Sequence, residues 1–390
     1  MVRSTGSPVY ERLGIKRVVN GISWRTNVGG SLMPTPVVEA MEQASRWFVD
    51  LDELNSKAGK IIANLTGAEA GLVTAGSFAG MVLESAACIA GTDPAKIRQL
   101  PNTTGMKNEI LIQWSHRVGY DRAFRATGAK LIQIGGVGET QDWELESAIN
   151  ENTAAVVHVF AAPSIGSLPL ETVVEIAHSK GVPVIVDAAA MLPPPENLTR
   201  YISMGADMVS YSGGKGVLGP QSTGILCGRS DLIEAARANS SPNPHGIGRA
   251  AKVCKEEIAG LITALELFVD TDHQALNSKW DSQCQHIVES LEDIDGIRAE
   301  FAKATPELDE FESATPRVYI YFESSWNGPG HDKIIDQLAN NDPSIRVLKI
   351  ANSGWLPQNV PGIMISPVNL LQGEPELIAS RLREVLTNRS

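Results

Sequence analysis

Ser212-Gly213-Gly214-Lys215-Gly216 is the stretch that most narrows the fold and chemistry of this 390-residue chain. The apolar run from Asp207 to Tyr211 precedes it directly and predicts a buried strand. A turn rich in glycine lets the backbone bend sharply and approach whatever it binds. The sequence therefore places a lysine on a tight turn at the end of a strand.

A second apolar run, Val182 to Val186, lies upstream and ends in Asp187-Ala188-Ala189-Ala190. Pyridoxal 5'-phosphate (PLP) requires an amine for its Schiff base and a carboxylate against its pyridine nitrogen. Lys215 and Asp187 supply these two groups, so the sequence predicts a PLP enzyme in which both residues are catalytic. Lys215 is expected to act as acid and base, with its pKa lowered by its surroundings. The alternatives are a surface lysine in a glycine loop and an aspartate that only caps a helix.

Short apolar runs alternate with amphipathic stretches between about residues 60 and 230. This alternation predicts an α/β fold with a mostly parallel sheet covered by helices. The predicted strands are residues 70–73, 110–114, 130–134, 154–160, 182–186, 207–211 and 224–227. The predicted helices among them are residues 81–90, 142–150 and 171–180.

The length suits a large domain together with a smaller one. We expect an N-terminal segment (1–55), a large PLP-binding domain (56–255), a linking helix (256–295) and a small C-terminal α+β domain (296–390). The first 55 residues read as irregular, apart from a helix from Val37 to Val49. The small domain is expected to contain strands at 317–322, 345–350 and 362–366, and helices at 332–339 and 375–387.

Composition restricts the classes of partner. The chain has 43% hydrophobic residues, 20% charged residues and a net charge of -12, with its positive residues scattered. This balance indicates a compact protein and argues against a nucleic-acid partner. Without an apolar signal core or a run near the ~18 residues that a membrane span needs, we expect a cytoplasmic protein. The four cysteines lack metal-type spacing, so buried thiols are expected, with neither a metal nor a disulfide.

A turn suited to a phosphate group lies between Thr74 and Gly80. Its small residues let backbone N–H groups approach an anion, and the following helix N-terminus adds a favourable partial charge. Gly76, Ser77 and Phe78 are therefore predicted to bind the cofactor. An ordinary strand-to-helix turn is the alternative. Ser212 is expected to contact the phosphate through its hydroxyl, and Ser210 is a weaker candidate.

His116 follows the predicted strand 110–114 and precedes Asp187 in the chain. A flat side chain there could stack on the pyridine ring, and imidazole could assist proton transfer near the reacting carbon. We therefore predict that His116 binds the cofactor and takes part in catalysis. A histidine on a surface loop is the alternative.

The order of phosphate turn, histidine, aspartate and lysine resembles the fold-type I PLP enzymes, the aspartate aminotransferase superfamily. More narrowly, the chain resembles the family of bacterial selenocysteine synthase (L-seryl-tRNA(Sec) selenium transferase) and its D-glucosaminate-6-phosphate ammonia-lyase-like relatives. The similarity covers roughly residues 8–385. The segments that carry it are Val19-Asn20-Gly21, Arg25-Thr26-Asn27-Val28-Gly29-Gly30, Gln113-Trp114-Ser115-His116, Val186-Asp187-Ala188-Ala189-Ala190 and the lysine turn.

This resemblance implies a seven-stranded-type sheet, a small C-terminal domain and a homodimer or higher homo-oligomer, with active sites at subunit interfaces. It makes Arg25 a candidate for binding a substrate carboxylate or phosphate, with a structural salt bridge as the alternative. Gln221 and Arg249 are further substrate-binding candidates. Arg249 and Lys252 are candidates for binding a phosphate of the cofactor or of the substrate, and solvated charges at a helix start are the alternative.

The chain departs from the selenium transferases in two respects. Those enzymes carry an extra N-terminal domain that holds tRNA, and they have an arginine where this chain has Gly30. The acidic balance also argues against a tRNA surface. A lyase acting on a small amino acid or amino sugar acid therefore fits the resemblance better.

We predict that Lys215 removes the α-proton, water is then eliminated from the β-position, and deamination gives a 2-keto acid. Racemisation and aldol cleavage are alternatives from the same chemistry. A selenium transferase-like protein on seryl-tRNA and a non-catalytic PLP-binding protein are alternatives from other classes. Nothing in the sequence separates an amino sugar acid from a simple β-hydroxy amino acid.

Overall fold

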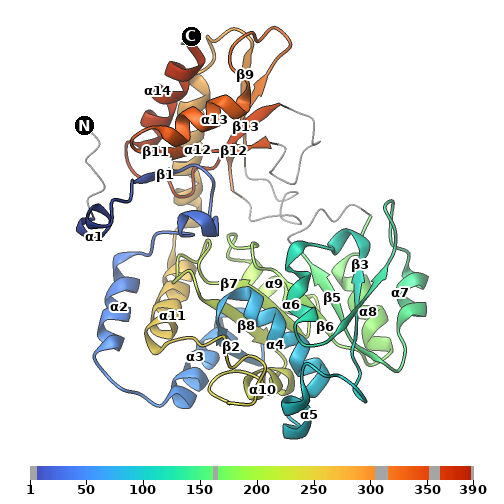
Figure 1. Ribbon diagram of the computed structural model, residues 1–390. Helices are drawn as coiled ribbons and strands as arrows, with labels where there is room; N and C mark the ends of the chain where they lie inside the picture. Colours follow the sequence, from blue (N-terminus) through green and yellow to red (C-terminus); the bar gives the residue numbers. More distant parts are fainter. Residues whose placement is uncertain (1–6, 161–165, 304–314, 351–360, 388–390) are drawn as a thin grey trace. The chain divides into compact units, whose positions relative to one another are not determined.

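The computed structural model describes residues 7–160, 166–303, 315–350 and 361–387. The chain divides into two compact units, which are shown in Figure 1. The larger unit holds residues 33–271, and the smaller holds residues 7–32, 272–303 and 315–387 of the described chain. None of the helices described is long and apolar enough to cross a membrane.

The larger unit is built on a seven-stranded sheet. Its strands are β2 (Ala70–Thr74), β3 (Glu109–Gln113), β4 (Lys130–Ile134), β5 (Thr153–Val159), β6 (Val184–Asp187), β7 (Met208–Ser212) and β8 (Gly224–Gly228). In space their order is β2-β8-β7-β6-β5-β3-β4. The neighbours from β7 to β4 run parallel, whereas β8 runs antiparallel to both β2 and β7. The predicted mostly parallel sheet is therefore confirmed.

Helices cover both faces of this sheet (Figure 1). Strands buried on both faces read as continuous apolar runs, which is why the sequence made them recognisable. One face packs against α4 (Gly76–Ala90), α6 (Arg122–Arg125) and α10 (Ser230–Ala238). The other packs against α3 (Leu51–Thr66), α7 (Asp142–Ala148), α8 (Leu170–Ser179), α9 (Asn197–Ser203) and α11 (Lys255–Asp270). The unit also contains α2 (Thr35–Ser45) and α5 (Pro94–Gln99).

The helix expected over residues 37–49 is present as α2 (Thr35–Ser45), two residues earlier at its start and four at its end, whereas the start of α3 at Leu51 was not expected. Helix α3 begins after Asp50, whose carboxylate accepts hydrogen bonds from the N–H groups of Asp52 (2.8 Å) and Glu53 (2.9 Å). It ends at Gly67, where a φ of +70° closes the helix in the left-handed region. Its buried side chains, Ala58 and Ile62, pack on the sheet. Capping and one apolar stripe thus produce a helix from a largely polar sequence.

The smaller unit combines a four-stranded antiparallel sheet, ordered β12-β13-β10-β9, with a parallel β1-β11 pair. Its strands are β1 (Val18–Asn20), β9 (Ile297–Ala302), β10 (Arg317–Phe322), β11 (Ser344–Arg346), β12 (Leu348–Lys349) and β13 (Gly362–Ile365). Its helices are α1 (Pro8–Arg12), η1 (Thr26–Val28), α12 (His273–Glu289), α13 (His331–Asn340) and α14 (Glu374–Thr387). An ion pair between Arg17 and the buried Glu374 ties the first residues to α14.

The strand expected at 345–350 is instead two short strands in different sheets. β11 pairs with β1, whereas β12 pairs with β13. Strand β9 was not predicted from the sequence, because only one of its six residues, Ile297, is buried. The pairing of these strands depends on partners distant in sequence, which a local pattern does not reveal.

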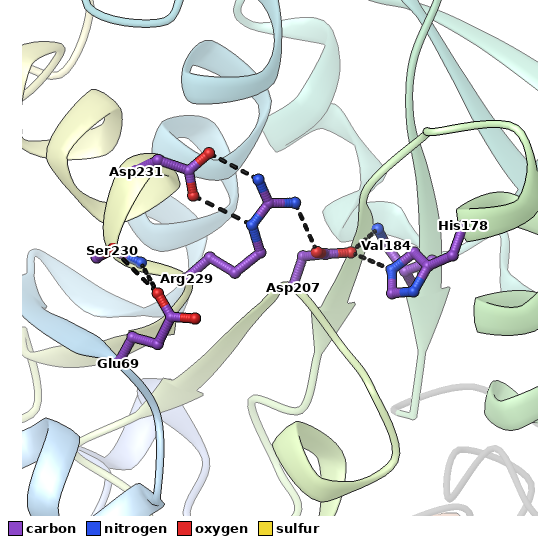
Figure 2. A network of polar contacts seen from close by, with 7 residues as sticks. All are labelled: Glu69, His178, Val184, Asp207, Arg229, Ser230 and Asp231. Carbon is purple, nitrogen blue, oxygen red and sulfur yellow. Dashed lines mark hydrogen bonds and ion pairs between the residues drawn. The ribbon is translucent and has the colours of Figure 1, made fainter.

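Asp207 anchors the larger sheet at the edge where β6 and β7 begin (Figure 2). Its carboxylate is 4% exposed and accepts hydrogen bonds from Val184 N (2.7 Å), His178 Nε2 (2.8 Å) and Arg229 Nη1 (2.9 Å). Arg229 also pairs with Asp231, and Glu69 accepts hydrogen bonds from Ser230. One buried carboxylate thus joins the start of β6, helix α8 and the end of β8.

Replacing Asp207 should destabilise the larger unit. Asp207→Asn removes the charge and one acceptor from three bonded groups, so we expect the free energy of unfolding to fall by about 2–3 kcal/mol. Urea unfolding measures this change. Asp231→Asn, at an exposed partner of the same arginine, should cost about 0–1 kcal/mol. Equal losses in the two variants would contradict the anchoring role.

Candidate active site

Asp187 is the last residue of β6 and lies at the opposite edge of the sheet from Asp207. It is 2% exposed, and its Oδ1 accepts a hydrogen bond from Ala189 N at 3.0 Å. Burial raises the pKa of its carboxyl, and the Ala189 N–H group and the positive charge of Lys215 oppose that rise. The charge of Lys215 thus favours the ionised form of Asp187.

Lys215 is half-buried in a compact turn between β7 and β8. The turn is closed by bonds from Gly213 N to Thr223 O (2.9 Å) and from Leu218 N to Lys215 O (2.9 Å). A Cβ atom on Gly214 would lie 2.3 Å from the Cα atom of Gln221. The glycines are thus required by close backbone packing.

Leu218, on the same turn, has a φ of +61°. This left-handed conformation is uncommon for a leucine, and it persists only where the surrounding structure holds it. The hydrogen bond from its N–H group to Lys215 O is part of that restraint. The turn therefore holds the lysine backbone in one defined conformation.

The turn between β2 and α4 matches the expected phosphate site in its local geometry. Gly76 has a φ of +78°, a left-handed conformation that favours glycine, and it begins α4. Ala75 precedes the helix without a side-chain cap. Ser77 and Phe78 follow in the first turn, and Phe78 is 44% exposed. Because the first N–H groups of a helix have no partner within it, this terminus suits an anion.

Strand pairing brings the turn and the lysine loop to one edge of the sheet. Ser212 of β7 pairs with Gly224 of β8, which also pairs with Thr74 of β2. A Cβ atom on Gly224 would lie 2.4 Å from the carbonyl carbon of Gly76. Two residues that end strands, Asp187 and Ser212, therefore lie at this edge, together with residues that follow strand ends closely: Gly76, Ser77, Phe78 and Lys215.

His116 lies at the same edge, in the single 3-10 turn η2 (Trp114–His116) that follows β3. It is fully buried, so the alternative of a surface loop histidine is wrong. Its Nδ1 atom accepts a hydrogen bond from Val159 N (3.3 Å), next to Asp187 in the sheet. Burial lowers its pKa to about 4. His116 is therefore neutral at pH 7, with its proton on Nε2.

The ring of His116 meets a second buried histidine that the sequence analysis missed. The centroids of His116 and His158 are 4.4 Å apart in an edge-to-face arrangement. His158 lies 4.6 Å from Phe160, which lies 4.4 Å from Tyr201. Burial lowers the pKa of His158, and repulsion between the two rings, if both were protonated, lowers it further. Its position inside an otherwise apolar strand was the signal available in the sequence.

The three substrate-binding candidates occupy different surroundings. Gln221 is exposed and lies against Gly214 of the lysine turn. Arg249 is half-buried on a segment fixed by a bond from Gly248 N to Asn239 O (2.9 Å). Arg25 is exposed and belongs to the smaller unit, just before η1.

The segment that carries Arg249 and Lys252 returns to the phosphate turn. Residues of this segment, among them Ser240 and Ala251, line a cavity of about 30 Å³ together with Thr74 and Ala75. Lys252 itself is exposed. The fold therefore brings Gln221 and this segment to the lysine and phosphate turns, whereas Arg25 belongs to the other unit.

One cysteine differs from the expectation of buried thiols. Cys227 and Cys284 are buried and Cys88 is partly buried, but Cys254 is exposed. Cys254 precedes α11, where the helix start leaves it at the surface. No group of three His, Cys, Asp or Glu side chains in the part of the chain described here could hold a metal ion.

Comparison with known proteins places these observations in a family. The family model of L-seryl-tRNA selenium transferase (SelA) matches residues 18–280. D-glucosaminate-6-phosphate ammonia lyase of Salmonella typhimurium is 33% identical over 383 residues, which cover 97% of both chains. A 5'-C-glycyluridine monooxygenase-decarboxylase of Streptomyces is 33% identical, covering 88% of this chain and 85% of that one. L-seryl-tRNA(Sec) selenium transferase of Aquifex aeolicus is 26% identical over 74% of this chain and 68% of its own.

Solved structures of other proteins have the same fold as this chain. A D-glucosaminate-6-phosphate ammonia-lyase superposes with a TM-score of 0.84 and 31% identity, over 99% of this chain and all of that one. A NifS-like protein (16% identity, TM-score 0.60) covers 96% of this chain and 100% of its own. Serine palmitoyltransferase from S. paucimobilis (13%, 0.58) covers 95% and 87%. The expected fold, that of the fold-type I PLP enzymes, is confirmed.

The packing of α4 on β7 can be tested at Gly80. A Cβ atom there would lie 2.6 Å from Ser210 Oγ, so Gly80→Ala should destabilise the protein by about 1–3 kcal/mol through overpacking. Thermal or urea unfolding measures the loss. Because the clash is with the hydroxyl oxygen, adding Ser210→Ala should recover most of it.

Gly119→Ala is the matched control, because a Cβ atom at Gly119 meets nothing within 4 Å. It should leave stability within about 0.5 kcal/mol of the wild type. A Gly80→Ala protein as stable as this control would contradict the close approach of α4 to β7.

Proposed function

Since the chain belongs to the L-seryl-tRNA selenium transferase (SelA) family, we propose that it is a PLP-dependent lyase. Its substrate would be an amino sugar acid or another small β-hydroxy amino acid. The reaction would be removal of the α-proton, loss of the β-hydroxyl as water, and release of ammonia to leave a 2-keto acid. The observation that carries this proposal is the position of the buried Asp187 at the end of β6 and of Lys215 on the turn after β7, both at one edge of the sheet.

The residues at this edge fit PLP. The buried carboxylate of Asp187 suits the protonated pyridine nitrogen, and the amine of Lys215 suits the aldehyde carbon. The uncapped start of α4, at Gly76, Ser77 and Phe78, suits the phosphate group. When bound, PLP supplies an electron sink for the negative charge that develops at the substrate α-carbon.

The protein groups then have separate tasks. Lys215 would hold the cofactor through its amine, and the same amine, when free, would take the α-proton of the substrate. The same amine, once protonated, can return that proton to the departing β-hydroxyl. Asp187 keeps the ring nitrogen protonated. The neutral His116, with its proton on Nε2, would lie against the pyridine ring of the cofactor.

An amino sugar acid phosphate is the first substrate to test, because the ammonia lyase of Salmonella typhimurium matches over 97% of both chains. D-glucosaminate 6-phosphate, D-glucosaminate, D- and L-serine and threonine form the panel. Ammonia and keto acid should appear together, in equal amounts, with one of them. Turnover of none of them, with the cofactor bound, would contradict the lyase assignment.

Decarboxylation is the second candidate, favoured by the 33% identity to the monooxygenase-decarboxylase of Streptomyces. It predicts carbon dioxide release and oxygen consumption, whereas the lyase reaction releases ammonia without consuming oxygen. Running the panel under air and under nitrogen separates the two. An oxygen-dependent product would support the second candidate over the first.

Removing the proposed amine should abolish turnover. Lys215→Ala should lower kcat by at least about 10³-fold, because one side chain supplies both the covalent link and the proton transfer. Ammonia release measures the loss. Lys60→Ala, at an exposed lysine of α3, is the control and should keep wild-type activity. If both variants were active, Lys215 would not be the catalytic lysine.

We also propose that the chain acts as a homodimer or higher homo-oligomer. Trp47, Phe48 and Val49 lie between α2 and α3 with exposed fractions of 74%, 103% and 51%. Three consecutive apolar side chains in water favour burial against a second copy.

We propose a cytoplasmic location as well. The thiols of Cys88, Cys227, Cys254 and Cys284 are free, and free thiols suit a reducing compartment such as the cytoplasm.

The association can be tested at Phe48. Phe48→Asp should shift the sedimentation mass from two or more chains towards one, because it places a charge in the proposed contact. Trp143→Asp is the control, since Trp143 is 64% exposed on α7 and should leave the mass unchanged. A wild-type protein that sediments as one chain would contradict the proposal.

A further inference from the structure

Glu84 is a buried acid that the proposed mechanism does not use. It is the one charged residue of α4, the helix that begins at the phosphate turn. Its side chain is 0% exposed, and neither carboxyl oxygen makes a hydrogen bond of ordinary geometry with the described residues. A carboxylate left this way in an apolar interior is costly, so its protonation state must be accounted for.

Ser210 and Asp187 are the neighbours of Glu84 on the sheet. Ser210 Oγ is buried and, like Glu84, lacks a hydrogen-bond partner of ordinary geometry in the described chain. It points at α4, because a Cβ atom on Gly80, one helical turn before Glu84, would lie 2.6 Å from it. Ser210 pairs in register with Asp187, so both side chains leave the same face of the sheet. The three side chains therefore form one buried cluster.

Two carboxyl groups in such a cluster do not both ionise readily, because their charges repel in a medium of low dielectric. Asp187 is supported as an anion by the Ala189 N–H group and by the charge of Lys215. For Glu84, the Ser210 hydroxyl is the one group among the described residues that favours the charged form. The proton of the pair therefore belongs on Glu84.

The direction of the Glu84 pKa shift also favours a protonated Glu84. Burial raises the pKa of Glu84 well above its ordinary value, the Ser210 hydroxyl lowers it, and the charge of Asp187 raises it further. The other titratable groups near it are the thiols of Cys227 on β8 and Cys88 on α4 itself. Burial raises the pKa of both thiols, and the Glu84 charge adds to the rise. They stay neutral where Glu84 would titrate.

We propose that Glu84 remains a neutral carboxylic acid beneath Asp187 and serves as a positioning residue that leaves the negative charge of this cluster on Asp187. Its purpose rests on the proposed function, in which Asp187 meets the ring nitrogen of PLP. An ionised Glu84 would favour protonation of Asp187, which would then lose its hold on the protonated ring. A neutral Glu84 therefore leaves Asp187 ionised, as the proposed function requires.

The first test uses the cofactor-free protein and compares wild type with Glu84→Gln, which is neutral at every pH. A carboxyl with a raised folded pKa contributes stability that is fully present below about pH 4.5 and is lost as the pH rises towards the folded pKa. From pH 5 to 8, the unfolding constant of wild type relative to Glu84→Gln should therefore rise by up to about tenfold per pH unit. Urea unfolding at each pH measures the ratio.

Glu39→Gln is the matched control, because Glu39 is an exposed glutamate on α2. Its ratio to wild type should stay flat over the same range. A flat ratio for Glu84→Gln as well, or one that falls with pH, would overturn the proposal. In an Asp187→Asn background the Glu84 ratio should level off at a lower pH, because the charge that raises the Glu84 pKa is gone. An unchanged profile there would overturn the coupling.

A second measurement needs no variant and covers the case in which Glu84→Gln fails to fold. Infrared spectra of the wild-type protein at neutral pH should contain the carbonyl band of a protonated carboxylic acid. That band should move on labelling with ¹³C-glutamate and not on labelling with ¹³C-aspartate. A band that moves only with the aspartate label, or no band at all, would overturn the proposal.

These tests are independent of turnover. If the protonated Glu84 is found but PLP does not bind, the proposed function fails while the protonation state stands. If PLP binds, the visible absorbance of the loaded enzyme should titrate with the same midpoint in wild type and Glu84→Gln. A midpoint shifted by a full pH unit or more would show that Glu84 carries charge beside Asp187, and would overturn its neutral role.

Discussion

The close packing of α4 against β7 is the constraint on which the rest of the site depends. Gly80 leaves room for Ser210, and Gly224 leaves room for the backbone of Gly76. This approach sets the uncapped start of α4 beside the end of β7 and the start of β8. The same approach buries Glu84 against the sheet on which Asp187 lies. The uncapped helix start and the buried acid pair thus follow from one interface.

The lysine turn also depends on close packing around glycines. Gly214 and Gly216 lie so near the backbone of Gln221 and Leu192 that side chains there would overlap other atoms. The turn is therefore held from both sides, and Lys215 is carried on a fixed support rather than a free loop. At the opposite edge of the sheet, the bonds to Asp207 hold the strand starts in register. The bonds to Asp207 at one edge and the packed turn at the other both hold the candidate site residues in fixed positions.

The sequence was sufficient where the signal was local. Strands 130–134 and 317–322 match β4 and β10 residue for residue, because continuous or alternating apolar patterns mark them. Asp187 and Lys215 could be proposed from the sequence, because Asp187 ends a strand and Lys215 follows one on a turn rich in glycine. Helix α3, strand β9 and the split between β11 and β12 were missed, because a cap or a distant pairing partner decides them. His158 and Glu84 were missed because their meaning comes from neighbours across the sheet.

The central claim is that Lys215 carries the cofactor, and chemical trapping tests it most directly. The purified wild-type protein, loaded with PLP, would be reduced with borohydride, digested and mapped by mass spectrometry. The account predicts one stable phosphopyridoxyl group, located on Lys215. A group found mainly on another lysine, or spread over several exposed lysines, would contradict it and would remove the basis for the roles given to Asp187 and Glu84.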